Sequence, residues 1–288
     1  MSAIFREAAP AKINLYLHVL GVRPDGYHDL DSLVAFARVC DTVAVTVAEQ
    51  PALTIDGPFG APLAAEPPTG NLVWRALHAL AEAVGRAPAV AIRLTKELPL
   101  ASGIGGGSSD AAACLRALTR LWRLDPHDRR LRDVAAGLGA DVPVCLAGVS
   151  AYFGGIGDQV EAAPALPSCP VVVVNPGVPL STPAVFKARR GPFSAAARLI
   201  EIPYDVVALA TLLEQRRNDL ADAARGLDPA IDPVLDSLDA APGCLLARLS
   251  GSGATCFGLF RDADDAGRAA ARIHAEHPAW WVRATRLG

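Results

Sequence analysis

A glycine-rich segment at residues 99–110, PLASGIGGGSSD, lies between two patterned stretches of the chain. The stretch before it, VAIRLTKEL, alternates as a strand does, and the stretch after it, AAACLRALTRLW, has helical spacing. A strand, a glycine loop and a helix in this order direct several backbone N–H groups at one point, where the helix dipole is positive. Glycine suits such a loop because its backbone can approach an anion closely.

The segment therefore predicts a phosphate site followed by a helix over residues 110–122. The expected binding residues are Pro99, Leu100, Ala101, Ser102, Gly103, Ile104, Gly105, Gly106, Gly107, Ser108 and Ser109. The two serines can cap the helix, donate to phosphate or reach a metal ion, and the sequence leaves these roles open.

Two common phosphate loops do not match this segment. A Walker loop places lysine after its last glycine, whereas Ser108 and Ser109 follow here. A dinucleotide fingerprint follows the first strand of its unit, and this loop lies far along the chain. The cation that balances a phosphate must therefore come from elsewhere. Of 27 basic residues only Lys12, Lys96 and Lys187 are lysine, which makes each retained lysine informative.

Composition restricts the class of protein. The chain has 288 residues, 51% of them hydrophobic, and a net charge of −3. No apolar run approaches the roughly 18 residues of a membrane helix, and the start lacks a secretion signal. We therefore expect a soluble, cytoplasmic protein with no membrane partner and no nucleic-acid partner. The six cysteines form no CxxC or Cys/His cluster, so we expect them to be reduced and mostly buried.

Elements of both kinds alternate along the chain. In the first half we expect strands at residues 11–21, 41–49 and 90–98, a hairpin plus loop at 51–68, and helices at 69–85 and from Asp125 to near Gly139. RPDGYHDL is expected to be a loop, GADVPVCLAG a connector, and residues 150–163 a strand or hairpin. In the second half we expect strands at 169–177 and 280–287, and two strands joined by a turn of small residues at 245–260. We expect helices at 181–190, 205–224, 229–240 and 262–276.

The composition changes at PALPSCP, so we place a domain boundary there, with domains at residues 1–166 and 167–288. Helices and strands in both halves predict an α+β architecture.

Three motifs together resemble the GHMP kinases, the superfamily of galactokinase, homoserine kinase, mevalonate kinase and phosphomevalonate kinase. They are PLASGIGGGSSDAA, APAKINLYLHVLGVRPDGYHDL and RLSGSGATCFGLF. With GADVPVCLAG, the set is most similar to the members whose small-molecule substrate carries a cytidine diphosphate group. The resemblance implies a two-lobed fold. Its N-terminal domain is ribosomal-protein-S5-like, binds ATP and carries the cytidine site, and its C-terminal domain is ferredoxin-like. It also implies ATP and Mg²⁺ as cofactors.

The resemblance assigns the chemistry to Lys12 as a catalytic cation and to Asp141 as the general base. Lys12 is two residues from Asn14 on an alternating strand, so both side chains face the same space. Asp141 lies in an otherwise small and apolar motif, where a carboxylate must be paired or desolvated. The alternatives are a solvated charge at a strand end for Lys12 and a turn or cap residue for Asp141.

The remaining site residues also follow from the resemblance. Asn71 and Lys96 would line the nucleotide pocket, Ser109 is the candidate metal ligand, and the substrate would contact Asn14, Tyr27, His28, Ser181, Thr182, Gly251 and Gly253. For the Tyr-His pair the expected ligand is cytosine, stacked on the tyrosine ring and hydrogen-bonded by the histidine. The alternatives are a loop anchor for that pair, an exposed strand end for Lys96, a helix cap for Ser181 and Thr182, and a plain hairpin turn for the two glycines.

Three other functions remain open at this point: a kinase for another small alcohol, a metabolite sensor without turnover, and an RNA-binding module. The GYHDL segment disfavours a kinase for another small alcohol. The presence of both Lys12 and Asp141 disfavours a sensor without turnover, and the net charge disfavours an RNA-binding module. The sequence leaves the oligomeric state, monomer or homodimer, open.

Overall fold

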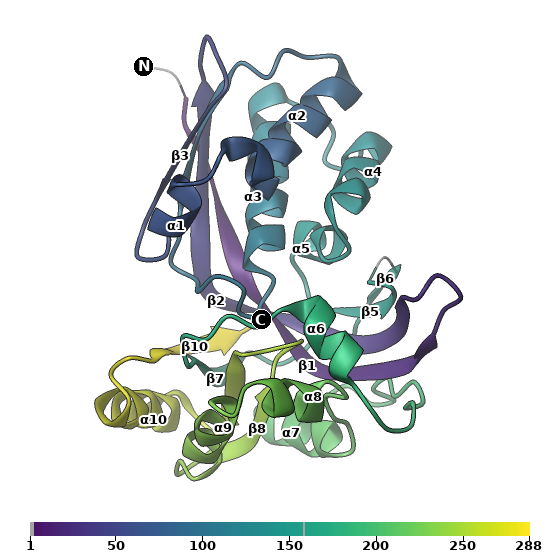
Figure 1. The fold of residues 1–288 in the computed structure, drawn as a ribbon, viewed down its shortest axis with the longest axis vertical. Coiled ribbons are helices and arrows are strands. Elements are labelled where there is room, and N and C mark those ends of the chain that lie inside the picture. The colour runs from purple at the N-terminus through teal and green to yellow at the C-terminus, as the bar shows by residue number, and fades with distance from the viewer. Residues whose placement is uncertain (1–2, 158) are drawn as a thin grey trace. The chain divides into compact units, whose positions relative to one another are not determined.

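The computed structural model describes residues 3–157 and 159–288, and it contains two compact units (Figure 1). The first unit comprises residues 3–11, 39–100 and 105–148, and the second comprises residues 12–38, 101–104 and 149–288. Two long strands, β1 (Phe5–Val22) and β2 (His28–Val47), contribute to both units. The expected domain boundary between residues 166 and 167 stays a prediction.

The first unit is a sheet with helices packed on it. β4 (Val90–Thr95) pairs antiparallel with the end of β2 and parallel with β3 (Ala52–Asp56). Its helices are α1 (Ala61–Ala64), the 3₁₀ turn η1 (Pro68–Gly70), α2 (Leu72–Val84), α3 (Gly106–Trp122), α4 (Arg129–Leu138) and α5 (Val142–Ala147). Helices α2 to α5 pack together on one side of these strands (Figure 1).

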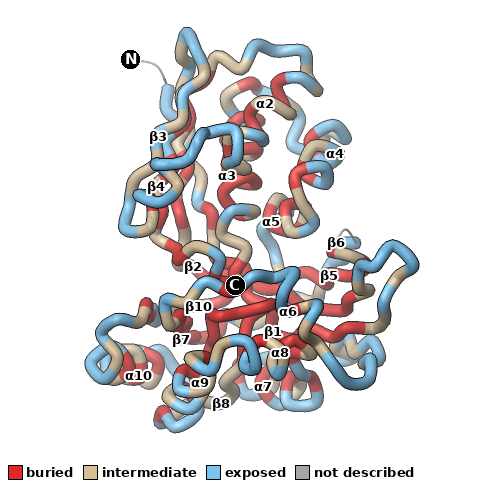
Figure 2. The backbone as a smooth tube through the Cα atoms, viewed as in Figure 1, coloured by how far each residue is buried: buried red, intermediate tan, exposed pale blue. Residues whose placement is uncertain are grey.

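Helix α3 is the core helix of this unit. It is built from small and apolar residues, and its first half is buried without interruption from Ser109 to Leu115 (Figure 2). The helix begins at Gly106, four residues before the expected start at Asp110, because Gly105 occupies the N-cap position with φ 66°. Ser108 and Ser109 consequently lie inside the first turn, so the structure excludes capping, one of the three roles that the sequence left open for them.

Three other expectations for this unit are wrong. Residues 51–68 do not form a hairpin, because β3 pairs in parallel with β4 and α1, η1 and α2 make the crossover that a parallel pair needs. GADVPVCLAG is not only a connector, because it contains α5 with Pro143 in its first turn. Helix α4 is capped by Asp128, whose side chain accepts from the Arg130 N–H, and not by Asp125.

The second unit is a mainly antiparallel α+β layer. Its strands, besides β1 and the start of β2, are β5 (Ala151–Gly155), β6 (Gln159–Ala162), β7 (Cys169–Asn175), β8 (Cys244–Leu249), β9 (Cys256–Phe260) and β10 (Trp281–Leu287). Its helices are α6 (Thr182–Ala188), α7 (Val206–Glu214), α8 (Ala221–Leu227), α9 (Ile231–Asp239) and α10 (Ala263–Glu276). Strands β10, β7, β9 and β8 lie side by side in that order, and α7, α9 and α10 pack against them.

Two expectations for the second unit need correction. Strand β2 begins at His28, so the loop between β1 and β2 is only a short turn. The single helix expected at residues 205–224 is two helices, α7 and α8, with an interruption at Asn218. The Asn218 amide donates to the carbonyls of Leu249 and Gly251 at 2.9 and 2.7 Å, and this tie holds the chain out of helical geometry. The α+β class is confirmed in both units.

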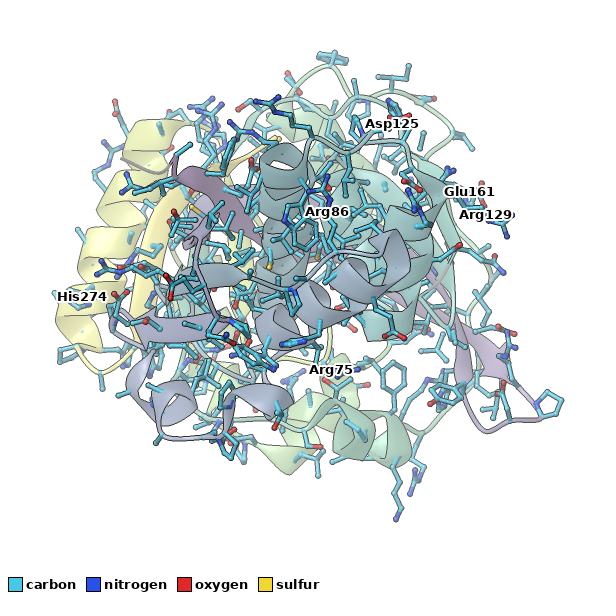
Figure 3. All side chains as sticks on the ribbon, turned by 90° about the horizontal axis from the view of Figure 1, so that it is seen from above. Arg75, Arg86, Asp125, Arg129, Glu161 and His274 are labelled. Atoms are coloured by element: carbon cyan, nitrogen blue, oxygen red, sulfur yellow. The ribbon has the colours of Figure 1, made fainter. Side chains whose placement is uncertain are left out.

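Charged side chains lie mostly on the surface. The labelled Arg129 and Glu161 in Figure 3 are examples, with side chains 85% and 56% exposed. Against this background, the buried charges described below are exceptions. Among the described residues, no helix has both the length and the apolar character needed to cross a membrane.

The six cysteines are free thiols, and we predict that they are slow to react in the native protein. Cys40 and Cys244 are half-buried and the others are buried. Burial raises the pKa of Cys169 and Cys244 to about 11, so little thiolate exists near neutral pH. The test is the rate of reaction with a colorimetric thiol reagent, compared with the same protein in denaturant. Native thiols that react as fast as denatured ones would contradict the structure.

Candidate functional site

Strand β1 holds Lys12 beside the glycine loop. The backbone N–H of Lys12 donates to the carbonyl of Ile104 at 2.9 Å. Only 4% of Lys12 is exposed, and its ammonium lies 4.8 Å from the centre of the Phe153 ring. Lys12 is therefore not a solvated charge at a strand end, because an ammonium buried at this cost needs a defined role.

Asn14 is the next residue on the same face of β1, and it has an unused acceptor. Its backbone N–H donates to Ser250 Oγ at 3.1 Å and its Nδ2 donates to Ser32 Oγ at 2.8 Å. The residue is 1% exposed, yet its Oδ1 has no hydrogen-bond partner in the protein. A buried acceptor without a partner is costly, and the surrounding described protein atoms supply no donor to this oxygen.

The glycine loop and the turn at residues 250–253 touch backbone to backbone. Gly103 has φ 75°, and a Cβ there would lie 2.5 Å from the Gly253 carbonyl oxygen and 2.8 Å from that of Ser250. A Cβ on Gly251, which has φ 55°, would lie 2.8 Å from the Gly103 oxygen. Since no L side chain fits such a contact, Gly103 and Gly251 are required for the approach, and a plain turn does not explain Gly251.

The contact is reinforced on both sides. The Thr255 N–H donates to the Ser102 carbonyl at 3.2 Å, and the Leu180 N–H donates to that of Ala101 at 3.4 Å. Thr182 Oγ1 and Ser252 Oγ share a hydrogen bond of 2.7 Å. Within the second unit, the structure thus brings together Lys12 and Asn14, the loop at residues 101–104, Thr182, and the turn that contains Gly251 and Gly253. Ser181 is at the N-cap position of α6 without a side-chain capping bond.

In the first unit the loop continues as Gly105 and the start of α3. The N–H groups of this first turn lie at the positive end of the helix dipole. Ser109 is 1% exposed, and its hydroxyl donates to the Pro10 carbonyl at 2.6 Å. No group of three or more His, Cys, Asp or Glu side chains that could hold a metal ion occurs among residues 3–157 and 159–288.

Lys96 is buried rather than exposed. Its ammonium bonds to Oδ2 of Asp41 and, at 2.7 Å, to Oδ2 of Asp110. Burial lowers the pKa of Lys96, but the two carboxylates outweigh that effect and raise it, so the ammonium stays charged. Burial raises the pKa of Asp110, whose Oδ1 has no partner. The expected contact of Lys96 with a nucleotide stays a prediction, although its ammonium already has two partners.

Asp141 and Asn71 both begin helices of the first unit. Asp141 occupies the N-cap position of α5 but its carboxylate does not cap that helix, so capping does not explain the residue. Asn71 does cap α2, because its Oδ1 accepts from the Val73 N–H at 2.9 Å. Asp141 is half-buried, which suits a carboxylate that receives a proton from a ligand.

Tyr27 and His28 lie at the turn between β1 and β2. Tyr27 is 62% exposed, which leaves its ring open to a flat ligand. The His28 ring packs against Phe186 with 5.0 Å between ring centres. Burial and the nearby Arg189 hold the pKa of His28 below its ordinary value, so the ring is neutral at pH 7 and offers one donor and one acceptor.

Sequence reasoning missed four residues of these surroundings: Asp41, Asp110, Phe186 and Ser250. Asp41 and Asp110 carried a signal, since each is a lone carboxylate at the edge of an apolar element. Phe186 and Ser250 carried none, because their role depends on partners more than 150 residues away in the sequence.

Comparison with known proteins agrees with this geometry. The family model of the GHMP kinase N-terminal domain matches residues 71–149, and that of the GHMP kinase C-terminal domain matches residues 205–279. Both domains of a GHMP kinase are therefore present. A solved structure of a mevalonate kinase from L. major in complex with R-mevalonate has the same fold, with a TM-score of 0.70 at 16% identity over 99% of this chain and 96% of that one.

Proteins with higher sequence identity to this chain indicate which family of GHMP kinases it belongs to. The 4-diphosphocytidyl-2-C-methyl-D-erythritol kinase of Paramagnetospirillum magneticum is 52% identical over 98% of each chain. That of Rhodospirillum rubrum is 52% identical over 98% of this chain and 92% of its own. A crystal structure of 4-(cytidine 5′-diphospho)-2C-methyl-D-erythritol kinase has a TM-score of 0.80 at 36% identity over 98% of this chain and 99% of that one.

The chain belongs to the 4-diphosphocytidyl-2-C-methyl-D-erythritol kinase family of the GHMP kinases. It is an ATP-dependent small-molecule kinase. The GHMP kinase fold expected from the motifs is confirmed, and the S5-like and ferredoxin-like description of its domains is consistent with the match.

The glycine contact gives a direct prediction for Gly103→Ala. The matched control is Gly177→Ala, because Gly177 lies in the same unit with φ 83° and nothing within 4 Å of its Cβ position. Both changes strain the backbone by about 1–2 kcal/mol, and only Gly103→Ala adds a steric clash, which costs a further ~1–3 kcal/mol. Chemical denaturation measures the free energy of unfolding of both variants. An equal loss of unfolding free energy in the two variants would contradict the close contact.

Proposed function

We propose that this chain transfers the γ-phosphoryl group of ATP to the 2-hydroxyl of 4-diphosphocytidyl-2-C-methyl-D-erythritol, a step of the non-mevalonate route to isoprenoid precursors. The observation that carries the proposal is the backbone bond between Lys12 and the glycine loop at Ile104, with Lys12 and Asn14 buried side by side on β1. The names of the relatives at about half identity supply the substrate.

ATP is held through its phosphates by the loop at residues 99–109, with Asn71 in the nucleotide pocket and Lys96 bordering that pocket beside Gly106, its ammonium bonded to Asp41 and Asp110. Backbone N–H groups at the start of α3 suit phosphate oxygens because they are fixed before the ligand arrives. Gly251 and Gly253 let the second glycine motif come close to the phosphates, and Ser181 and Thr182 contact phosphates of the substrate.

In the reaction the substrate hydroxyl oxygen attacks the γ-phosphorus of ATP. The new O–P bond forms as the bond from the γ-phosphorus to the bridging oxygen breaks, and ADP leaves with that electron pair. Asp141 takes the hydroxyl proton, and Lys12 balances the charge of the reacting groups. A buried ammonium is suited to this role because little water screens its charge.

The organic part of the substrate is recognised by Asn14 on β1, by Tyr27 in the turn that follows and by His28 at the start of β2. The free Oδ1 of Asn14 accepts a hydrogen bond from the methylerythritol part and orients it. Tyr27 stacks on the cytosine ring, and the neutral His28 bonds to its edge.

We also propose that Mg²⁺ accompanies ATP. The protein offers it few ligands, since the Ser109 hydroxyl is bonded to Pro10 and no acidic cluster is present among the described residues. A magnesium ion that is bound mainly by phosphates and water fits this donor set, and it would neutralise phosphate charge. We assign ATP and cytidine binding to residues 1–166, the second GHMP domain to residues 167–288, and the enzyme to the cytoplasm.

Asp141→Asn and Lys12→Ala test the assigned chemistry. We predict that each lowers kcat by about 10²–10⁴, the usual contribution of a general base, because the proton acceptor or the charge partner is lost. Phosphorus NMR with Mg-ATP and the diphosphocytidyl alcohol measures the new phosphomonoester signal. Asp133→Asn is the control, since Asp133 is an exposed carboxylate of α4. Full activity in the two site variants would keep the kinase and contradict the mechanism.

Tyr27→Ala tests the cytidine site. We predict that KM for the alcohol substrate rises about tenfold, the loss of one aromatic stack at ~1.4 kcal/mol, while KM for ATP stays unchanged. Tyr204→Ala is the control, because Tyr204 is 85% exposed and belongs to no proposed site. Turnover of mevalonate or homoserine at a comparable kcat/KM, unaffected by Tyr27→Ala, would favour the rival small-alcohol kinase.

A further inference from the structure

Three buried charged residues of the first unit form a cluster that the phosphoryl-transfer chemistry does not use. The Lys96 ammonium lies between the Oδ2 atoms of Asp41 and Asp110, with 2.7 Å to Asp110. The three side chains are 2%, 0% and 3% exposed. Because the cluster has no contact with bulk water, its geometry is set by the protein alone.

The cluster connects the two ends of the glycine loop. On one side, Oδ1 of Asp41 accepts the backbone N–H groups of Glu97 and Leu98, at 2.6 and 2.8 Å, where the chain leaves β4. On the other side, Asp110 belongs to α3 and follows its first turn. Lys96 Nζ lies only 3.6 Å from where a Cβ of Gly106 would be. Lys96 therefore joins the segment that enters the loop to the helix that leaves it.

Stability alone does not account for such a cluster. Desolvation of buried charges offsets most of their attraction, and well-packed apolar residues of similar volume are often at least as stable. What charged hydrogen bonds add is direction and distance, because they are short and strongly oriented. Lys96, directly after β4, and the carboxyl groups of Asp41 on β2 and Asp110 on α3 thus restrain how these elements meet at the loop.

Building on the proposed kinase function, we propose that Lys96, Asp41 and Asp110 are positioning residues for the phosphate loop. They fix the position of the first turn of α3 relative to the end of β4. The N–H groups of Gly105, Gly106 and Gly107 are then oriented toward the phosphates of ATP before ATP binds. In this role the Lys96 ammonium contacts neither the adenine ring nor a phosphate. Its effect on ATP passes through the backbone.

The experiment compares ATP with adenosine by isothermal titration calorimetry, in the absence of the alcohol. For Lys96→Met we expect the Kd of ATP to rise at least about tenfold, since small displacements of preorganised groups are costly. The Kd of adenosine, which has no phosphate, should change less than about twofold. Arg93→Met is the matched control. Arg93 lies on β4, the strand directly before Lys96, and its replacement breaks an exposed ion pair with Asp56 of β3.

A second variant separates positioning from folding. Lys96→Met/Asp41→Asn/Asp110→Leu removes all three ionisable groups, while the amide oxygen of an asparagine can still accept the two backbone N–H groups that Asp41 accepts. We expect this variant to unfold at nearly the wild-type temperature, because no unpaired charge is left buried, and still to bind ATP about tenfold more weakly, with adenosine unaffected. Wild-type affinity for ATP in the folded triple variant would overturn the proposal and leave the cluster a purely structural role.

An equal rise in the Kd of ATP and in the Kd of adenosine for Lys96→Met would also overturn the proposal, because Lys96 would then act in the adenine pocket. The binding measurement needs no phosphoryl acceptor. Absence of turnover by the wild-type enzyme would therefore refute the proposed substrate without affecting this test.

Discussion

The approach of Gly103 to the turn at residues 250–253 is the contact on which the rest of the site depends. Two glycine motifs almost 150 residues apart meet with no side chain between them, closer than any Cβ would allow. The strand that carries Lys12 and Asn14 is attached to both motifs, through Ile104 and through Ser250. A side chain at Gly103 would push the two motifs apart. Lys12, Asn14 and the glycine loop would then no longer be held in fixed positions relative to one another.

The contact between the two motifs also explains why polar groups are buried here, although their burial costs desolvation free energy. Lys12 and Asn14 are almost fully enclosed, and the Asn14 oxygen has no partner within the protein. Elsewhere the chain satisfies its buried amides, as Asn218 does with two carbonyls. On β1 the unsatisfied acceptor of Asn14 faces the same side as the buried Lys12 ammonium, and both groups suit the substrate that we propose.

The sequence predicted those parts of the fold that depend on local pattern. Strands β4, β7 and β10 and helices α2 and α10 follow from periodicity and from caps such as Gly85 and Asp262. Parallel pairing of β3 with β4 was not predictable, because a hairpin and a crossover have the same local signals. The interruption at Asn218 was missed because its cause is a pair of carbonyls on β8 and its following turn.

For the site, motif spacing indicated Lys12, Asn14 and the two glycine motifs. The structure brings Lys12, Asn14, residues 101–104 of the first motif and the turn at residues 250–253 together in the second unit. Lys96 shows the limit of such reasoning. Its position in the sequence, at the end of a strand before the loop, was equally consistent with an exposed charge and with a nucleotide contact. Only the fold reveals the two carboxylates that surround it, one from β2 and one from α3.

β1, residues 101–104 of the glycine loop and the turn at residues 250–253 form one backbone framework that is built before any ligand binds. A crystal structure with a non-hydrolysable ATP analogue and the diphosphocytidyl alcohol would test whether this framework positions both ligands. We predict phosphate oxygens within hydrogen-bond distance of the N–H groups of Gly105–Gly107, and a hydroxyl of the alcohol bonded to Asn14 Oδ1. Phosphates bound away from the start of α3, with the Asn14 oxygen facing no ligand, would contradict it.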